Sequence, residues 1–509
     1  MCASNRVAGN VLTSPLDDAA HPWGGSVTRT DETAPREAAP AAKLSMLTMT
    51  GMVVGSMVGA GVFSLPRRFA QETGVAGSLI AWSIAGVGML MLAFVFQMLA
   101  NRKPELDAGV YAYAKAGFGQ FLGFFSAIGY WASAGMGLVF YWVFIMSTIG
   151  AVAPALGDGD TLLAIGISSL GLWGFFFLIR RGIKEAAVIN RIVTVAKLVP
   201  IVVFILLCLF VLKPQVFAEN WGGADYAGSL FDQVTGTMLV TVFVFLGVEG
   251  ASVYSRHAKR RADVGKATIL GFLSVFATFA SVTLVSYGVL PMGEIAQLRQ
   301  PSMAGVLAAA VGPWGAWFVS IGLVVSVLGA YLAWSLMAAE VLFVAAKDND
   351  MPRFLSRSNA ADVPVPALLM TAIFVQVILV ITYFSHDAFN LALDLTSALT
   401  LIPFFLVACY AMKLVITRET YGDAPRGWGR ETTIAVLATL YTAYLIFAAG
   451  VTFVLLSFII YAPATVLFVM ARREQGRRVF TGRELIILAV AVIGAITGIV
   501  ALAAGWISI

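Results

Sequence analysis

The sequence predicts an all-α integral membrane protein with about 13 transmembrane helices, ten of which form a core of two inverted five-helix halves. Three observations lead to this fold class. The composition is that of a bilayer protein, the apolar runs are long enough to span a membrane, and two of them, the first and the sixth, are interrupted by glycines. We therefore expect a core organised around two broken helices.

The composition excludes an ordinary soluble protein. Of the 509 residues, 59% are apolar and 12% are charged, and the mean hydropathy is +0.87. Cys2, Cys208 and Cys409 lie far apart, without metal or redox spacing. The sequence holds no HExxH, GxSxG or GxxxxGKS/T motif. We therefore expect no enzymatic activity, no bound metal and no cofactor.

The predicted spans divide the chain into three parts. A span takes about 20 apolar residues. The candidate spans cover roughly residues 45–67, 75–100, 120–150, 161–180, 187–212, 232–256, 267–291, 313–345, 366–385, 389–415, 432–449, 451–470 and 484–507. Residues 1–43 carry no apolar run and are expected to form a disordered cytoplasmic tail. Residues 44–416 form the predicted ten-helix core, and residues 417–509 form peripheral helices.

Basic residues indicate the orientation of the spans. The loops after even-numbered spans hold 24 Lys and Arg residues, against only Arg67, Arg68, Lys213 and Arg299 on the other side. Because basic loops stay in the cytoplasm, we expect a cytoplasmic N-terminus and an extracytoplasmic C-terminus. This asymmetry also explains the net charge of +5 without a nucleic acid, and makes the lipid bilayer the expected partner.

The glycine-interrupted runs are GMVVGSMVGAGVFSLP at 51–66 and FVFLGVEG at 243–250. Glycine costs about 1 kcal/mol relative to alanine in a helix, and a broken helix at membrane depth is tolerated only where its freed backbone groups are buried in protein or line a cavity. Close helix packing through small residues is the alternative. Interruptions at corresponding positions of two halves favour a substrate site at the midplane, and five spans per half invert the second half.

Both runs carry a family resemblance. GSMVGAGVFSLP and FLGVEGASVYS resemble the first-helix and sixth-helix signatures of the amino acid–polyamine–organocation (APC) superfamily. The segments ANRKPELDAGVYAYAKAGFG, RRGIKEAAVIN, KRRADVGKAT and AAKDNDMPRFL are similar to the bacterial basic amino acid antiporters, above all the arginine/ornithine exchangers. The resemblance runs from about residue 44 to the end of the chain. It implies the LeuT-like five-plus-five fold in a bacterial inner membrane.

The broken helices are expected to bind the backbone of an amino acid. The substrate-binding groups predicted there belong to Gly55, Met57, Gly59, Ala60, Gly61, Phe243 and Gly247. The N–H groups of Gly59 to Gly61 would start a half-helix, whose positive end suits an α-carboxylate. Relatives often carry a serine between these glycines, so Ala60 leaves recognition to N–H groups alone. Carbonyls of both breaks would accept hydrogen bonds from the α-ammonium.

Aromatic side chains are the candidates for holding a cationic side chain, at about 0.5–2 kcal/mol for each stacked ring. Phe243 stands where close relatives often show tryptophan, which weakens the implied platform and an arginine preference. Trp334 matches a substrate-packing tryptophan of relatives. Tyr130 and Trp131 are further candidates for the cavity wall. Packing in the core or at the membrane interface is the alternative for each.

Charged residues inside spans are functional candidates, because a charge near the midplane is costly unless it is paired or hydrated. Glu249 matches a glutamate that the resemblance implies in proton sensing or gating. Glu340 and Asp394 are candidates for the same cavity, or for carboxyls hydrogen-bonded between packed helices. Lys197 resembles a lysine that replaces sodium in some relatives, with snorkelling to the cytoplasmic interface as the alternative.

The residues and the resemblance together predict a membrane antiporter that exchanges cationic amino acids, most simply arginine for ornithine, by alternating access. The alternatives within this class are an amino acid/decarboxylation-product exchanger, such as lysine/cadaverine or arginine/agmatine, and a proton-coupled basic amino acid permease. An amino acid sensor is the alternative from another class. A homodimer and a monomer both remain open.

Overall fold

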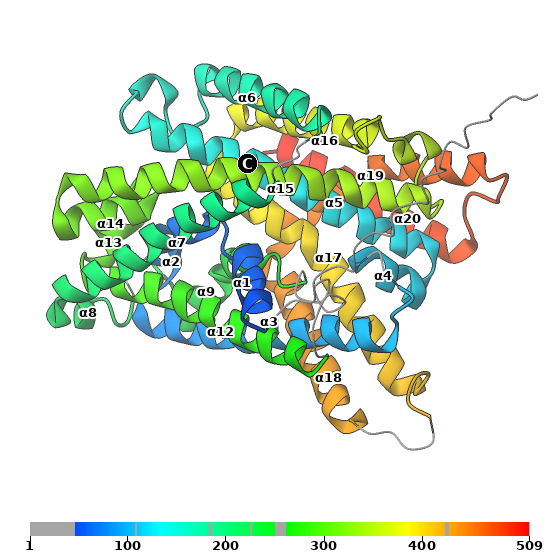
Figure 1. The fold of residues 1–509 in the computed structure, drawn as a ribbon, viewed down its shortest axis with the longest axis horizontal. Helices are drawn as coiled ribbons and strands as arrows, with labels where there is room; N and C mark the ends of the chain where they lie inside the picture. Colours follow the sequence, from blue (N-terminus) through cyan, green and yellow to red (C-terminus); the bar gives the residue numbers. More distant parts are fainter. Residues whose placement is uncertain are drawn as a thin grey trace, which may run out of the picture. The chain divides into compact units, whose positions relative to one another are not determined.

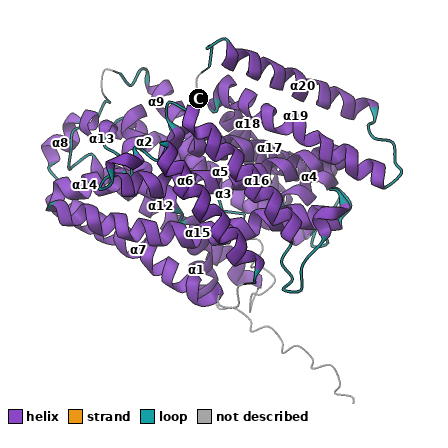
Figure 2. Cartoon of the chain, turned by 90° about the horizontal axis from the view of Figure 1, so that it is seen from above, coloured by secondary structure: helices purple, strands orange, loops and turns teal. Residues whose placement is uncertain are grey.

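The computed structural model describes residues 46–106, 109–182, 186–223, 226–249, 261–422 and 427–507. These residues form helices joined by loops, with no strand among them (Figure 1, Figure 2). In a bilayer, a helix satisfies its own backbone hydrogen bonds, which explains why the apolar runs are helical. The predicted tail, 1–43, and the end of the sixth predicted span, 250–256, lie outside the described residues.

The predicted spans all fall on helices. The first ten correspond to α1 (Met46–Met57) with η1 (Ala60–Ser64) and α2 (Leu65–Glu72), α3 (Val75–Arg102), α5 (Gln120–Gly150), α6 (Leu162–Arg180), α7 (Ala186–Val211), α9 (Leu230–Gly236) with α10 (Met238–Phe245), α12 (Arg261–Ser286), α15 (Pro313–Lys347), α16 (Val365–Ile381) and α17 (Ala388–Thr417). The last three are α18 (Trp428–Ala448), α19 (Gly450–Glu474) and α20 (Gly482–Ala503). Shorter elements between the spans are α4 (Val110–Phe118), η2 (Pro154–Leu156), α8 (Pro214–Glu219), α13 (Met292–Gln297), α14 (Ser302–Val311), η4 (Arg353–Ser356) and η5 (Thr382–Phe384).

The number of full spans is not confirmed at 13. Among the described residues, ten helices are long and apolar enough to cross a membrane, and the bent pair Met49–Met57 with Ala60–Glu72 makes an eleventh. The other two predicted spans coincide with α7 and with the α9–α10 pair. Their described apolar stretches, Val195–Val211 and Leu230–Phe245, are each shorter than 18 residues.

Two structural pairs relate the first five spans to the next five. The short helices α4 and α14 each precede the third span of a half, and each is joined to it by one glycine: Gly119 (φ 94°, ψ 177°) before α5 and Gly312 (φ 96°, ψ 178°) before α15. The positive φ of both residues favours glycine. The fifth spans, α7 and α17, each carry an internal proline, Pro200 and Pro403. These matched features are those of a structural repeat.

The centre of the fold is formed by α5, which packs against α17, α15 and α4. Of the most apolar part of α5, 94% is buried, against 22% for α20. Most of the exposed side chains of α20 are apolar, with Ile486 and Ile493 among them. An apolar exposed helix is stable where its neighbours are lipid chains. The difference in burial therefore places α5 at the core and α20 at the lipid boundary.

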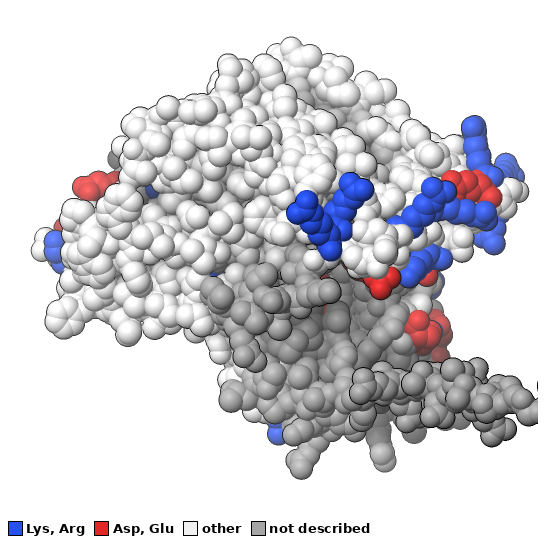
Figure 3. All heavy atoms as spheres, turned by 45° about the horizontal axis from the view of Figure 1, so that its top comes forward, with Lys and Arg blue, Asp and Glu red and all other residues white. Residues whose placement is uncertain are grey.

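Basic residues gather at one end of the spans. The last turns of α3, α6, α15 and α19 carry Arg102, Arg180, Lys347 and the pair Arg472 and Arg473. We call this end the basic face. In the space-filling view, most of the visible Lys and Arg side chains gather toward one side of the molecule, a broad uncharged surface lies beside them, and a few charged side chains appear at the opposite edge (Figure 3). Since α3 and α15 both end at the basic face, α4 lies on it and α14 lies at the opposite end.

Candidate substrate site

The first span breaks between Met57 and Ala60. α1 ends at Met57, and a bend of 49° separates it from the helix Ala60–Glu72. Gly59 precedes this second helix in an extended conformation, with φ −106° and ψ −163°. The first N–H groups of a helix have no acceptor within it and form its positive end. The predicted carboxylate-binding segment, Gly59 to Gly61, therefore lies at a true helix start.

The sixth span breaks after Phe245, and its break meets that of the first span. Leu246 leaves the helical region, with ψ 136°, and Gly247 adopts φ 101°. A Cβ atom on Gly247 would lie 2.5 Å from the Ser56 carbonyl oxygen, so only a glycine fits against this backbone. Ser56 Oγ lies 3.3 Å from the Gly247 carbonyl oxygen and donates to it. The structure thus brings together two segments that are 191 positions apart in the chain.

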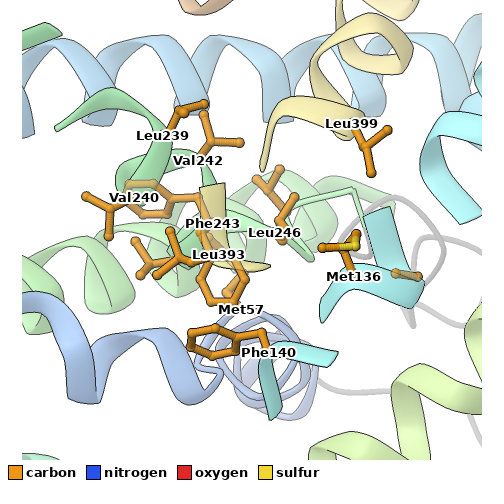
Figure 4. Packing of buried hydrophobic residues seen from close by; sticks show 14 of the residues in the cluster. Met57, Met136, Phe140, Leu239, Val240, Val242, Phe243, Leu246, Leu393 and Leu399 are labelled. Atoms are coloured by element: carbon orange, nitrogen blue, oxygen red, sulfur yellow. The ribbon is translucent and has the colours of Figure 1, made fainter. Parts of the chain in front are cut away.

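Aromatic rings cover the start of the second half of the first span. A Cβ atom on Gly61 would lie 2.7 Å from Cδ1 of Phe243, so the ring lies directly on this glycine. Phe243 meets Phe140 of α5 edge-on at 4.7 Å between centroids, and Phe140 meets Phe389 of α17 at 4.8 Å. Figure 4 shows Phe243, Phe140 and Met57 in this apolar cluster. The predicted stacking residue Phe243 therefore lies at the break.

Lys197 reaches the broken helix from α7. Its Nζ donates to the carbonyl oxygen of Gly55 at 2.6 Å, and the residue is 6% exposed. This carbonyl belongs to the last turn of α1, where helix carbonyls lack an intrahelical donor. Lys197 is thus buried against the break and does not extend to an interface. Its ammonium already occupies an acceptor that the sequence assigns to the substrate.

Tyr130 and Glu249 form one polar unit. The Tyr130 hydroxyl, from α5, donates to Oε1 of Glu249, and Oε2 accepts from the Gly247 N–H at 3.1 Å. The same hydroxyl lies 3.8 Å from Sδ of Met337 on α15. The carboxylate therefore ties the sixth-span break to α5, and Tyr130 contacts α15 as well.

Asp394 forms a buried ion pair with Arg68. Its two carboxylate oxygens lie 2.7 and 2.9 Å from NH2 of Arg68, so the pair joins α17 to α2. Arg68 is 6% exposed and Asp394 is 7% exposed. Asp394 is therefore a partner in a helix-to-helix contact, which was the alternative that the sequence left open.

The remaining predicted residues lie less centrally. Nε1 of Trp131 donates to Thr371 at 2.9 Å, and its ring packs on Phe374 at 4.9 Å, so its contacts are with α16. Trp334 is half-buried on α15, a helix that contacts η1. Glu340 is exposed on the same helix. The structure thus joins Tyr130 to the site but does not bring Trp131 or Glu340 to the breaks.

Sequence reasoning missed several residues at the site. The structure adds Ser56, Phe140 and Tyr141 at the breaks, and Arg68 as the partner of Asp394. Tyr141 Oη lies 4.0 Å from the position of a Cβ on Gly59, which makes it the side chain nearest to that glycine. No periodicity separates Phe140 and Tyr141 from the other aromatic residues of α5. Arg68 carried one signal, as a rare basic residue at the end opposite the basic face.

The two breaks present backbone donors and backbone acceptors. Helix-start N–H groups at Gly59 to Gly61 suit a carboxylate. Carbonyls freed by the breaks suit an ammonium, as the Lys197 contact with Gly55 demonstrates for a protein ammonium. Paired broken helices that meet inside a repeated helical core define a class of protein, the secondary transporters.

Comparison with known proteins identifies the family within that class. The chain matches the model of the amino acid permease family over residues 44–496, and it belongs to this family. It is 48% identical over 475 residues to the arginine/ornithine antiporter of Pseudomonas aeruginosa, an alignment that covers 92% of this chain and 98% of the relative.

Two further relatives widen the comparison. A putative arginine/ornithine antiporter of Escherichia coli is 39% identical over 460 residues, which cover 89% of this chain and 98% of the relative. An L-lysine transport protein of Corynebacterium glutamicum is 38% identical over 489 residues, which cover 93% of this chain and 97% of the relative. The relatives are thus named for cationic amino acids, and each is matched over nearly its whole length.

Proposed function

We propose that this protein is an antiporter that exchanges arginine for ornithine by alternating access. The observation that carries the proposal is the contact between the two breaks, where Gly247 lies against the backbone of Ser56. The names of the relatives support arginine and ornithine as the pair of substrates.

The α-carboxylate binds at the start of the helix Ala60–Glu72, where Ala60 supplies an N–H group and no hydroxyl. The α-ammonium binds among the freed carbonyls. Gly55 contributes less to it than the sequence suggests, because its oxygen accepts from Lys197 at 2.6 Å. Met57 and the turn that begins at Leu246 supply the other carbonyls.

The cationic side chain of the substrate packs against aromatic faces. Phe243 is the nearest candidate, since it lies on Gly61 and is 8% exposed. A phenylalanine attracts a guanidinium less strongly than a tryptophan does. The site therefore discriminates weakly between a guanidinium and an ammonium, as an exchanger of arginine for ornithine requires. Trp334 forms the opposite wall once the substrate is bound.

Charge at the break makes the transport independent of sodium. The ammonium of Lys197 supplies a fixed positive charge on the carbonyl of Gly55. A sodium ion at this carbonyl would face that charge at close range. Glu249, held by Tyr130, acts as the gating or proton-sensing carboxyl between the sixth span and α5.

Alternating access requires that each end of the site close in turn. At the end opposite the basic face, Arg68 pairs with Asp394, and Arg67 NH2 lies 3.7 Å from Asp387 Oδ2, so α2 is fastened to α17. Ser302 of α14 accepts from the Arg67 N–H at 3.1 Å. We propose that the structure represents a state closed toward this end, which the positive-inside rule makes the extracytoplasmic one.

The proposal includes the placement of the whole chain. The basic face lies in the cytoplasm of a bacterial cell, with the N-terminus on that side and the C-terminus on the other. Residues 44–416 carry the transport core, and residues 417–509 are peripheral helices, whose exposed α20 is also available to a second copy in a homodimer. The protein needs no catalytic group.

Exchange in proteoliposomes tests the function. The purified protein is reconstituted with ornithine, agmatine, lysine or buffer inside, the membrane potential is clamped, and uptake of radiolabelled arginine is measured. We expect uptake with internal ornithine, none with buffer inside, and no dependence on the potential, because two monocations exchange. Potential-dependent uptake that prefers internal agmatine would identify a product exchanger. Uptake into empty vesicles driven by a pH gradient would contradict antiport.

A further inference from the structure

The turn between α19 and α20 concentrates positive charge on the basic face. The last turn of α19 carries Arg472 and Arg473, the connecting segment carries Arg477 and Arg478, and the first turn of α20 carries Arg483. We call residues 472–483 the arginine turn. Arg472 pairs with Glu484 at 3.3 Å, whereas the other four arginines are exposed and form no ion pair with the residues that the structure describes.

The acidic groups near the arginine turn are already engaged. Glu474 Oε2 accepts from the Arg353 N–H at 2.8 Å. Glu484 accepts from Arg472 with one oxygen and from the Thr481 N–H at 2.7 Å with the other, so it caps α20. Five arginines therefore share the turn with two glutamates, of which Glu484 pairs with Arg472 and caps α20 and Glu474 accepts from the Arg353 N–H. The turn keeps a positive charge that the described residues do not balance.

Arg483 adds a second argument for an external anion. It is the second residue of α20, next to the positive end of a 22-residue helix. A cation at a helix start is unfavourable, and an anion there is favourable. Glu484 already supplies one carboxylate at this helix start, and an anionic group bound beside Arg483 would offset the repulsion that the arginine adds.

An apolar surface begins directly beside this charge. Leu485, Ile486, Val490 and Ile493 of α20 are 49%, 67%, 55% and 64% exposed, in that order. A soluble anion would use the arginines and leave this surface bare. A phospholipid uses both, since its phosphate meets the arginines and its acyl chains cover the helix. We propose that the arginine turn is a binding site for the headgroup of an anionic phospholipid, whose chains lie along α20.

The arginine turn is joined to the rest of the basic face. Gln475 Nε2 donates to the Asn349 carbonyl oxygen at 2.5 Å, in the loop after α15. α4 contacts the same loop, because Tyr111 donates to Asp348 and Lys115 donates to Asp350.

On the other side of the turn, Phe468 and Phe480 pack on Phe121 of α5, at 4.9 and 5.7 Å. A lipid bound to the arginine turn therefore stabilises the contacts that hold α4, α5 and the end of α15 together. This inference needs only that the chain spans a membrane, and it does not depend on the transported substrate.

Lipid retention by the purified full-length protein tests the site. Native mass spectrometry is used to titrate phosphatidylglycerol or phosphatidylcholine onto the wild type, the double variant R477Q/R478Q and the control R180Q/R181Q. The control removes two exposed basic-face arginines at the end of α6, Arg180 in its last turn and Arg181 directly after it, which lie outside the arginine turn. Each arginine near an anionic headgroup contributes a factor of about five in affinity. We expect R477Q/R478Q to bind phosphatidylglycerol about 25-fold more weakly.

The outcomes separate the proposal from general attraction to a charged face. We expect the control to bind phosphatidylglycerol like the wild type, and phosphatidylcholine to bind all three proteins equally. Equal loss in both double variants would contradict a local site, as would unchanged binding in R477Q/R478Q. A third arm adds millimolar inorganic phosphate. If phosphate alone displaces the bound phosphatidylglycerol, the arginine turn is a site for soluble anions and the lipid proposal fails.

Discussion

Replacing Gly247 by alanine tests the contact on which the site depends. The residue has φ 101°, and the added Cβ atom would lie 2.5 Å from the Ser56 oxygen and 3.0 Å from the Ser56 carbonyl carbon. Both atoms belong to the backbone and cannot rotate away as a flexible side chain can. G247A must therefore either strain its own turn or push the two broken helices apart.

The size of the effect follows from these two terms. A non-glycine residue held in a sparsely populated backbone region costs about 1–3 kcal/mol. Displacing the Ser56 backbone by several tenths of an ångström adds a steric cost, so that a total of roughly 2–4 kcal/mol is reasonable. The same movement would shift the carbonyls of the turn relative to the N–H groups of Gly59 to Gly61. Misplacing a binding site by such amounts reduces rates strongly.

Thermal unfolding and ornithine-dependent arginine uptake provide the assay, with G55A as the matched control. Gly55 lies in α1, and a Cβ atom there would meet nothing within 4 Å. We expect G247A to lower the unfolding temperature by roughly 5 °C and uptake by about tenfold or more. We expect G55A to unfold at the wild-type temperature or above, since alanine favours a helix. Wild-type unfolding and uptake in G247A would refute the contact between the two breaks.

Three further predictions concern side chains at the breaks and at the closed end. Removing either partner of the Arg68–Asp394 pair, in R68M or D394N, should destabilise the protein by about 3–5 kcal/mol, because the remaining charge is buried alone. The double variant R68M/D394N should unfold at a higher temperature than the less stable of the two single variants. Losses of stability that add in the double variant would contradict the pairing. K197M should abolish arginine uptake, while wild-type uptake should be equal in sodium and choline media; stimulation of the wild type by sodium would contradict the role of Lys197. F243A should raise the KM for arginine about tenfold, in line with the loss of a cation–π contact, and should also destabilise the protein because the ring is buried at the break. An unchanged KM in the folded variant would exclude Phe243 from the site.

The sequence was sufficient to predict the helices and both breaks. Gly61 and Gly247 occupy positions where the structure leaves no room for a Cβ atom, and glycines inside an apolar run can be recognised without coordinates. The structure breaks the first span next to Gly59 and gives Gly247 a positive φ. The number of spans is not fixed in the same way: the described apolar stretches of α7 and of the α9–α10 pair, Val195–Val211 and Leu230–Phe245, are each shorter than a full span.

Contacts between distant helices could not be predicted. Lys197 and Gly55 are 142 positions apart, and Arg68 and Asp394 are 326 apart, so no local pattern reports their pairing. For Glu340, the geometry of a helix bears on the prediction. It follows Trp334 by six residues, and six residues at about 100° each turn a helix by 600°, so the two side chains point about 120° apart. Helical geometry alone therefore argued against placing both in one cavity, and the structure leaves Glu340 exposed.

Competition for binding tests most directly whether the two breaks form an amino acid site. Radiolabelled arginine is bound to the purified protein and displaced by ornithine, lysine or agmatine. Agmatine keeps the guanidinium of arginine but lacks the carboxylate that the helix start at Ala60 is expected to hold. A hydrogen bond to a charged group contributes about 1.5–3 kcal/mol, so agmatine should compete at least about tenfold more weakly than ornithine. Equal or stronger competition by agmatine would contradict carboxylate recognition at the break and with it the proposed exchange of arginine for ornithine.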